Sequence, residues 1–210
     1  GDVHKDRVSC ATCHGAHMIQ PVRDPATRGV PIAISERCAG CHDSVATVAF
    51  RDVHGIAARA QVAGAAPLHA DTAATCVACH GGHGMKPAHA LDREVALVER
   101  CGACHRREGE SYADTYHGRA TRVGYYRAAR CVDCHGSHEI FPSSDPRAST
   151  SAGRRVETCA ACHRSAARPG FVSYQPHVRP HDPADSPPVF AAWLRMNVLL
   201  FSVFAVFGLH

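Results

Sequence analysis

The chain has 210 residues and a formal charge of +4 with histidine neutral, and no basic stripe argues for a nucleic acid partner. Only 6% of the residues are aromatic, while glycine and proline number 17 and 13. Few periodic apolar runs occur before residue 189, so the polypeptide alone is poorly equipped to build a core. We expect bound cofactors to supply that core, and an apo-protein that is largely unstructured.

All twelve cysteines fall in Cys-x-x-Cys-His motifs. This spacing is typical of covalent haem c attachment, in which both thiols form thioethers with the haem and the adjacent histidine is an axial ligand of the iron. The predicted thioether residues are Cys10, Cys13, Cys38, Cys41, Cys76, Cys79, Cys101, Cys104, Cys131, Cys134, Cys159 and Cys162. The predicted proximal histidines are His14, His42, His80, His105, His135 and His163.

Zinc and disulfide bonds are the alternative uses of such cysteines. A tetrahedral zinc site combines two cysteine pairs or a pair with more distant histidines, and neither zinc nor a disulfide framework requires histidine directly after every pair. Six haem c groups are therefore the preferred interpretation. They would add twelve propionates and bring the net charge to about −8 before the irons are counted, so the charge of the bare chain is a poor guide to partners.

The motifs alternate between two kinds. The first, third and fifth continue as His-Gly-x-His, which adds His17, His83 and His138. The second, fourth and sixth lack this continuation, and each is followed further along the chain by another histidine, namely His54, His117 and His177. The spacing from each odd motif to its even partner is nearly constant, which indicates three repeats of a two-haem unit.

In chain order, the elements expected between the motifs are turns and helices. Turns are predicted at 21–31, 64–67 and 142–153. Helices are predicted over 43–63 and 106–123, and a short helix over 93–100 leads into the fourth motif. If the stretch from His42 to His54 were one straight helix, it would carry His54 about 18 Å from His42, to a neighbouring haem rather than its own. No strand alternation is evident.

Eleven histidines remain for six distal positions. The preferred distal set is His4, His17, His54, His83, His117, His138 and His177, which is one too many, so at least one is not a distal ligand or ligates something outside this domain. His181 is the alternate for His177, while His69 and His89 break the repeat. The acidic residues Asp52, Glu110 and Asp114 are predicted to lie on solvated helix faces.

The tail changes character after residue 188. Residues 189–210 are predicted to form an apolar membrane-anchor helix, about 31 Å long over 189–209, with Trp193 and Arg195 near its start. A buried packing helix is the alternative interpretation. His210 ends the run and is expected to face headgroups, with ligation of a b-type haem as the alternative. We also expect a removed signal peptide before residue 1 and further protein after residue 210.

The stretches 112–118 and 131–146 are the most specific part of this pattern. In these two stretches the chain resembles multihaem c-type cytochromes of the doubled Cys-x-x-Cys-His class. The resemblance extends over roughly residues 1–180. Members of this class often precede a membrane cytochrome b module and act in quinone-linked electron transfer. The resemblance implies a periplasmic or extracellular electron carrier whose partners are a quinone-linked membrane module and other redox proteins.

The predicted fold is mainly α-helical with much irregular structure: a hexahaem domain over 1–182 (repeats at about 1–63, 64–124 and 125–182), a linker over 183–188, and the anchor helix. Ligation of each iron by two histidines leaves no open position, which favours electron transfer over catalysis. Two alternatives stay open. One is a subunit of an extracellular cytochrome filament, and the other is a multihaem oxidoreductase of small nitrogen or sulfur oxyanions.

Overall fold

The computed structural model describes residues 4–5, 7–17, 19, 30–63, 74–85, 91–165 and 167–208, with only the backbone described at 30–31 and 91–95. Every regular element among these residues is helical, and none is a strand. The helices are α1 (Cys10–His14), α2 (Val30–Ala39), α3 (Asp43–Ala49), α4 (Val53–Val62), α5 (Cys76–His80), α6 (Leu91–Cys104), α7 (Arg106–Asp114), α8 (Tyr116–Arg122), α9 (Cys131–His135), α10 (Arg155–Ala160) and α11 (Pro187–Gly208), with a 3₁₀ turn, η2, at Phe171–Ser173.

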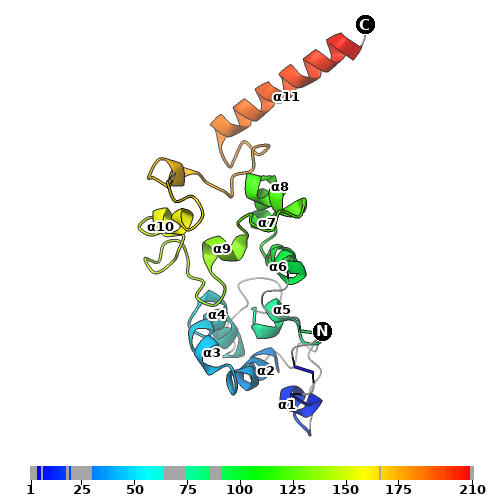
Figure 1. Ribbon diagram of the computed structural model, residues 1–210, viewed down its shortest axis with the longest axis vertical. Helices are drawn as coiled ribbons and strands as arrows, with labels where there is room; N and C mark the ends of the chain where they lie inside the picture. Colours follow the sequence, from blue (N-terminus) through cyan, green and yellow to red (C-terminus); the bar gives the residue numbers. More distant parts are fainter. Residues whose placement is uncertain are drawn as a thin grey trace.

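The molecule is elongated, with α1 near one end and α11 projecting from the other (Figure 1). The helices that carry cysteine motifs contact one another in chain order: α1 with α2, α2 with α5, α5 with α6, α6 with α9, and α9 with α10. The motifs therefore form a single file from the α1 end toward the base of α11. Neither the repeat boundaries nor the number of haems follows from this arrangement alone.

Few side chains are buried within this file. The buried apolar residues among those described are small or isolated, such as Ala46, Ala58 and Ala148, and the most fully buried side chains are those of Ser35 and Ser111. The solvent-accessible surface area of the chain is 14787 Å². A compact monomer of 22.4 kDa would expose about 9,400 Å². The polypeptide thus encloses little of its own apolar surface, as its composition predicts.

Odd and even motifs adopt different local structures. Each odd motif is a five-residue helix of its own (α1, α5, α9), closed by a glycine whose φ is +80° at Gly15, +80° at Gly81 and +79° at Gly136. That left-handed backbone suits glycine, and it turns the chain so that the second histidine of Cys-His-Gly-x-His leaves the helix. The even motifs instead lie at the ends of the longer helices α2, α6 and α10.

The two long helices expected between motifs are each broken. Residues 43–63 form α3 and α4, separated at 50–52, and residues 106–123 form α7 and α8, separated at Thr115. The break is a helix N-cap: Asp52 accepts hydrogen bonds from the backbone nitrogens of His54 and Gly55 at 2.9 Å each, and Thr115 Oγ1 accepts from Gly118 N at 3.0 Å. The expectation that Asp52 lies on a solvated face is wrong, because it is 4% exposed.

Other boundaries also differ from expectation. The short helix predicted over 93–100 runs from Leu91 to Cys104 and includes the fourth motif. Residues 142–153 form turns as predicted, whereas the turns predicted at 64–67 lie outside the described residues, as do all but the last two residues of 21–31. Helix α2 was not anticipated.

Helix α11 begins at Pro187, two residues before the predicted start, because proline suits the first turn of a helix. It is long and apolar enough to cross a membrane by length and composition, and none of its most apolar window is buried. The alternative of a packing helix buried within the described part of this chain is therefore wrong. The base of α11 is held by ion pairs of Asp185 with Arg107 of α7 and with Arg179, the latter at 2.9 Å.

Candidate haem sites

The proximal histidines each lie next to one histidine from outside the motifs. The six pairs, with their ring-centre separations, are His4–His42 at 6.2 Å, His14–His83 at 5.8 Å, His54–His105 at 6.1 Å, His80–His138 at 5.8 Å, His117–His163 at 6.0 Å and His135–His177 at 6.1 Å. In these six pairs, all between described residues, every motif histidine takes part once and no partner is shared. The two members of each pair come from different parts of the chain, and most pairs span at least one other motif.

This separation fits a metal ion between the rings. Imidazole nitrogen binds first-row metal ions at about 2 Å, and a ring centre lies about 1.1 Å behind its nitrogen, so two axial imidazoles have centres about 6 Å apart. Ordinary ring–ring contacts span a similar range of distances. The one-to-one pattern is what separates the two explanations, because random ring contacts have no reason to choose one partner for each motif.

The predicted distal histidines thus divide into two groups. Six of the seven lie beside a motif histidine: His4, His54, His83, His117, His138 and His177. His17 is exposed and pairs with no histidine ring among the described residues. The alternate His181 lies 4.0 Å from Asp114 instead. His69, His89 and His210 lie outside the described residues.

The elements around His54 and His117 position these rings in the same way. Each histidine is the second residue of a helix that starts directly after an N-cap, and each is followed by a glycine. A Cβ on Gly55 would lie within 3.0 Å of the Phe50 backbone, and one on Gly118 within 3.0 Å of the Ala113 backbone. Only glycine therefore lets α4 fold back against α3 and α8 against α7.

Two hydrogen-bond networks support these helices. The Tyr112 hydroxyl donates to the Ala129 carbonyl oxygen at 2.9 Å and lies 2.9 Å from Thr121 Oγ1, which ties α7 and α8 to the segment before α9. The backbone nitrogen of Val53 donates to the Ile140 carbonyl oxygen at 3.0 Å. This bond joins the start of α4, next to His54, to the segment that follows His138.

His177 has a polar partner that sequence analysis did not anticipate. The hydroxyl of Ser111, which is fully buried, donates to the Glu108 carbonyl oxygen at 3.0 Å and lies 2.9 Å from His177 Nδ1. Because that hydroxyl hydrogen is used, Ser111 accepts from Nδ1–H, which leaves Nε2 with a lone pair for a metal. The only sequence signal is the position of Ser111 on a helix after an even motif.

Burial also favours the neutral form in three of the paired rings. Burial lowers the pKa of His135, His117 and His177 below the ordinary value for histidine. The neutral imidazole is the form that ligates metals. The carboxylate of Asp52 lies 3.8 Å from His54 Nδ1, so it is close to the ring nitrogen that would face away from a metal bound through Nε2.

The cysteines of successive motifs lie close together. The side chains of Cys101 and Cys131, from the fourth and fifth motifs, lie next to each other. Cys38 of the second motif lies near Cys13 of the first motif and Cys76 of the third. No pair of the twelve forms a disulfide. Among the described residues, no group of three or more His, Cys, Asp or Glu side chains is arranged to hold a metal ion, so the donors are grouped as opposed pairs and not as tetrahedral clusters.

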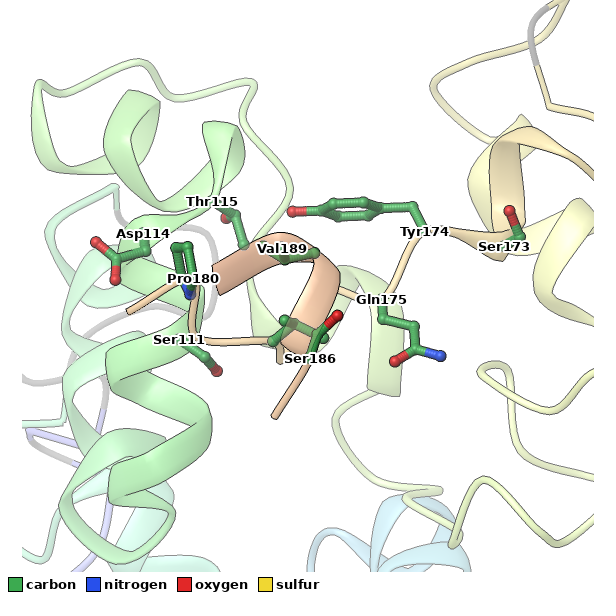
Figure 2. A pocket seen from close by; sticks show the side chains of 10 residues that line it. Ser111, Asp114, Thr115, Ser173, Tyr174, Gln175, Pro180, Ser186 and Val189 are labelled. Carbon is green, nitrogen blue, oxygen red and sulfur yellow. The ribbon is translucent and has the colours of Figure 1, made fainter. Parts of the chain in front are cut away.

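A cavity of about 400 Å³ lies at the base of α11 (Figure 2). Ser111 and Asp114 of α7 line one side, Tyr174 and Val178 another, and Val189 of α11 closes it. Ser111 links this cavity to His177. No residue of a cysteine motif lines it, so it is distinct from the spaces between the paired histidines.

Comparison with known proteins places this geometry in a class. Opposed histidine pairs above Cys-x-x-Cys-His motifs define a multihaem c-type cytochrome. Residues 68–164, which hold four of the six motifs, match the family model of cytochrome c3. This match supports covalent haem c and an electron carrier. No curated protein and no solved structure gives a significant match to the chain.

Proposed function

We propose that this protein is a membrane-tethered hexahaem cytochrome that relays electrons between a quinone-linked membrane module and periplasmic or extracellular acceptors. The observation that carries the proposal is the one-to-one pairing of six motif histidines with six other histidines at 5.8–6.2 Å. Haem c bound at each pair would supply a reversible one-electron couple of iron. The chain's own residues hold both axial positions, so no iron is left open to a substrate.

The distal assignments follow from the pairs. His83 serves the site of His14, His4 that of His42, and His138 that of His80. His54 serves the site of His105, His177 that of His135, and His117 that of His163. Each ligand pair joins residues from separate parts of the chain, so haem binding at one pair stabilises long-range structure that the sparse apolar core does not.

The order of the motif helices supports a conductor. Contacts run from α1 through α2, α5, α6 and α9 to α10, and Cys38 lies near cysteines of the first and third motifs, as Cys101 lies near Cys131 of the fifth. Haems attached to contacting helices would be neighbours, as transfer of electrons from one to the next requires. The file ends beside α11, which favours that end as the one facing a membrane partner (Figure 1).

The proposal is tested by the optical spectrum of the dithionite-reduced protein before and after addition of carbon monoxide. Two histidines on every iron predict six low-spin haems and no spectral change. Carbon monoxide binding by about one haem in six would instead mean an open or labile site and would favour the oxidoreductase alternative. Haem content by mass serves as the control that all six motifs are loaded.

Membrane tethering is tested separately by removing residues 187–210. We expect a soluble protein with its haems in place, because α11 contributes no buried residue to the rest of the chain. Loss of haem incorporation would contradict the modular role of α11. Solubility of the full chain without detergent would contradict the membrane anchor and favour the filament alternative.

A further inference from the structure

Four of the six ligand pairs follow a directional rule along the chain, whereas His177 lies beside the fifth motif and His4 precedes every motif. The second histidine of Cys-His-Gly-x-His lies beside the motif histidine of the preceding odd motif: His83 beside His14, and His138 beside His80. The histidine that follows an even motif lies beside the next even motif: His54 beside His105. The same holds for His117 and His163.

His17 belongs to this register but has no preceding odd motif within residues 1–210. Its local structure matches that of its counterparts. It comes two residues after Gly15, whose φ and ψ are +80° and 168°, against +80° and 160° at Gly81 and +79° and 178° at Gly136. The turn that presents His83 and His138 to a neighbouring site is therefore also formed at His17.

The internal sites have no place for His17. Each of the six motif histidines already faces a different histidine, and the ring of His17 pairs with none of those described. A second copy of residues 1–210 offers no open iron either, because its six sites are filled in the same way. The side chain is exposed at the α1 end of the file, far along the chain from α11.

We propose that His17 is an axial ligand for a haem iron outside these six, so that the file of haems continues past α1. The ligand it would take is a c-type haem with one axial position open, carried by a further segment of the same polypeptide or by another protein. The inference rests on the ligation proposed above, because it needs all six internal sites to be filled without His17.

The first experiment titrates the purified, haem-loaded protein of residues 1–210, in which no further segment can occupy His17, into a haem peptide that carries one Cys-x-x-Cys-His motif and has no distal ligand. Binding through His17 is expected to convert the peptide haem from high spin to low spin. His17→Ala should weaken this binding about tenfold or more. His181→Ala is the matched control, since its side chain is 55% exposed but lies outside the register, and it should bind like the parent protein. Equal binding by His17→Ala would overturn the proposal.

The same variants separate this inference from the proposed function. The His17→Ala protein should retain six low-spin haems and should not bind carbon monoxide. The His83→Ala protein should lose one axial ligand, so that about one haem in six binds carbon monoxide. A haem iron with an unoccupied axial position in the His17→Ala protein would mean that His17 is an internal ligand and that the assigned pairs are wrong. Retention of six low-spin haems together with unchanged peptide binding would overturn only the role of His17.

The source of the additional haem is identified by footprinting with diethyl pyrocarbonate, which modifies accessible imidazole nitrogens. Protection of His17 in the purified full-length polypeptide would assign the haem to another segment of that chain. Protection only in native membranes would assign it to a partner protein. Full modification of His17 under both conditions would contradict the proposal.

Discussion

Gly118 lies outside every motif, yet the structure makes it decisive for one haem site. It follows His117, the proposed distal ligand for the site of His163, at the start of α8. A Cβ at this position would lie far closer than 3.0 Å to the Tyr112 carbonyl oxygen, whereas ordinary contact begins at 3.4 Å. Gly118→Ala therefore forces α8 and α7 apart by about 1 Å or more.

That displacement is large compared with the tolerance of a metal–ligand bond, which is about 0.2 Å. His117 would move with the first turn of α8, and its ring, now 6.0 Å from that of His163, would no longer hold both positions on one iron. The strain itself is expected to cost about 1–3 kcal/mol of stability. One haem in six should become five-coordinate and bind carbon monoxide, while the other five stay low spin.

The assay is a carbon monoxide titration of the reduced protein with thermal unfolding followed at the Soret band. Gly55→Ala is the matched variant, because its Cβ would clash with the Ala49 carbonyl oxygen. It should displace His54 and leave the iron at the site of His105 without its distal ligand. Gly153→Ala is the control, since nothing lies within 4 Å of a Cβ there. A Gly118→Ala protein with six low-spin haems and parental stability would refute the reasoning.

Three further perturbations test the remaining structure. Ser111→Ala removes the acceptor for His177 Nδ1–H, which should lower the affinity of His177 for the iron about 10–100-fold. The reduction potential of one haem should rise in a potentiometric titration, and unchanged potentials at all six haems would contradict this role of Ser111. Hydrogen bonds from Arg147 lower the pKa of Asp145 to about 2. The carboxylate therefore stabilises the fold fully above about pH 4, and this contribution is lost as the pH falls toward 2. The melting temperature of the Asp145→Asn protein should lack this dependence on pH. Because the α11 end is the one proposed to face the quinone-linked module, we expect electrons to enter near the cavity at the base of α11. Val178→Trp, which fills that cavity, should then slow reduction by a soluble quinol analogue about tenfold without changing the spectrum, and an unchanged rate would contradict electron entry there.

Much of the local structure could be predicted because it depends on neighbouring residues. The alternation of motifs in sequence corresponds to two local structures, and the glycines of Cys-His-Gly-x-His end three similar short helices. The apolar tail forms one helix over Pro187–Gly208, as its length and composition predict. The breaks before His54 and His117 were missed, although Asp52 and Thr115 are recognisable N-cap residues followed by glycine.

The sequence by itself determined the class of chemistry, because each Cys-x-x-Cys-His motif is short and contiguous, and the family match supports the covalent haem c that these motifs predict. Only the tertiary structure decided which other histidine faces each motif histidine, because those partners come from separate parts of the chain and reach their sites through helix breaks, positive-φ turns and buried hydroxyl groups. His17 has the same sequence position relative to its motif as His83 and His138. The three-dimensional register separated these two from His17, since a ring can serve an iron only if the fold brings it within about 6 Å of its partner ring.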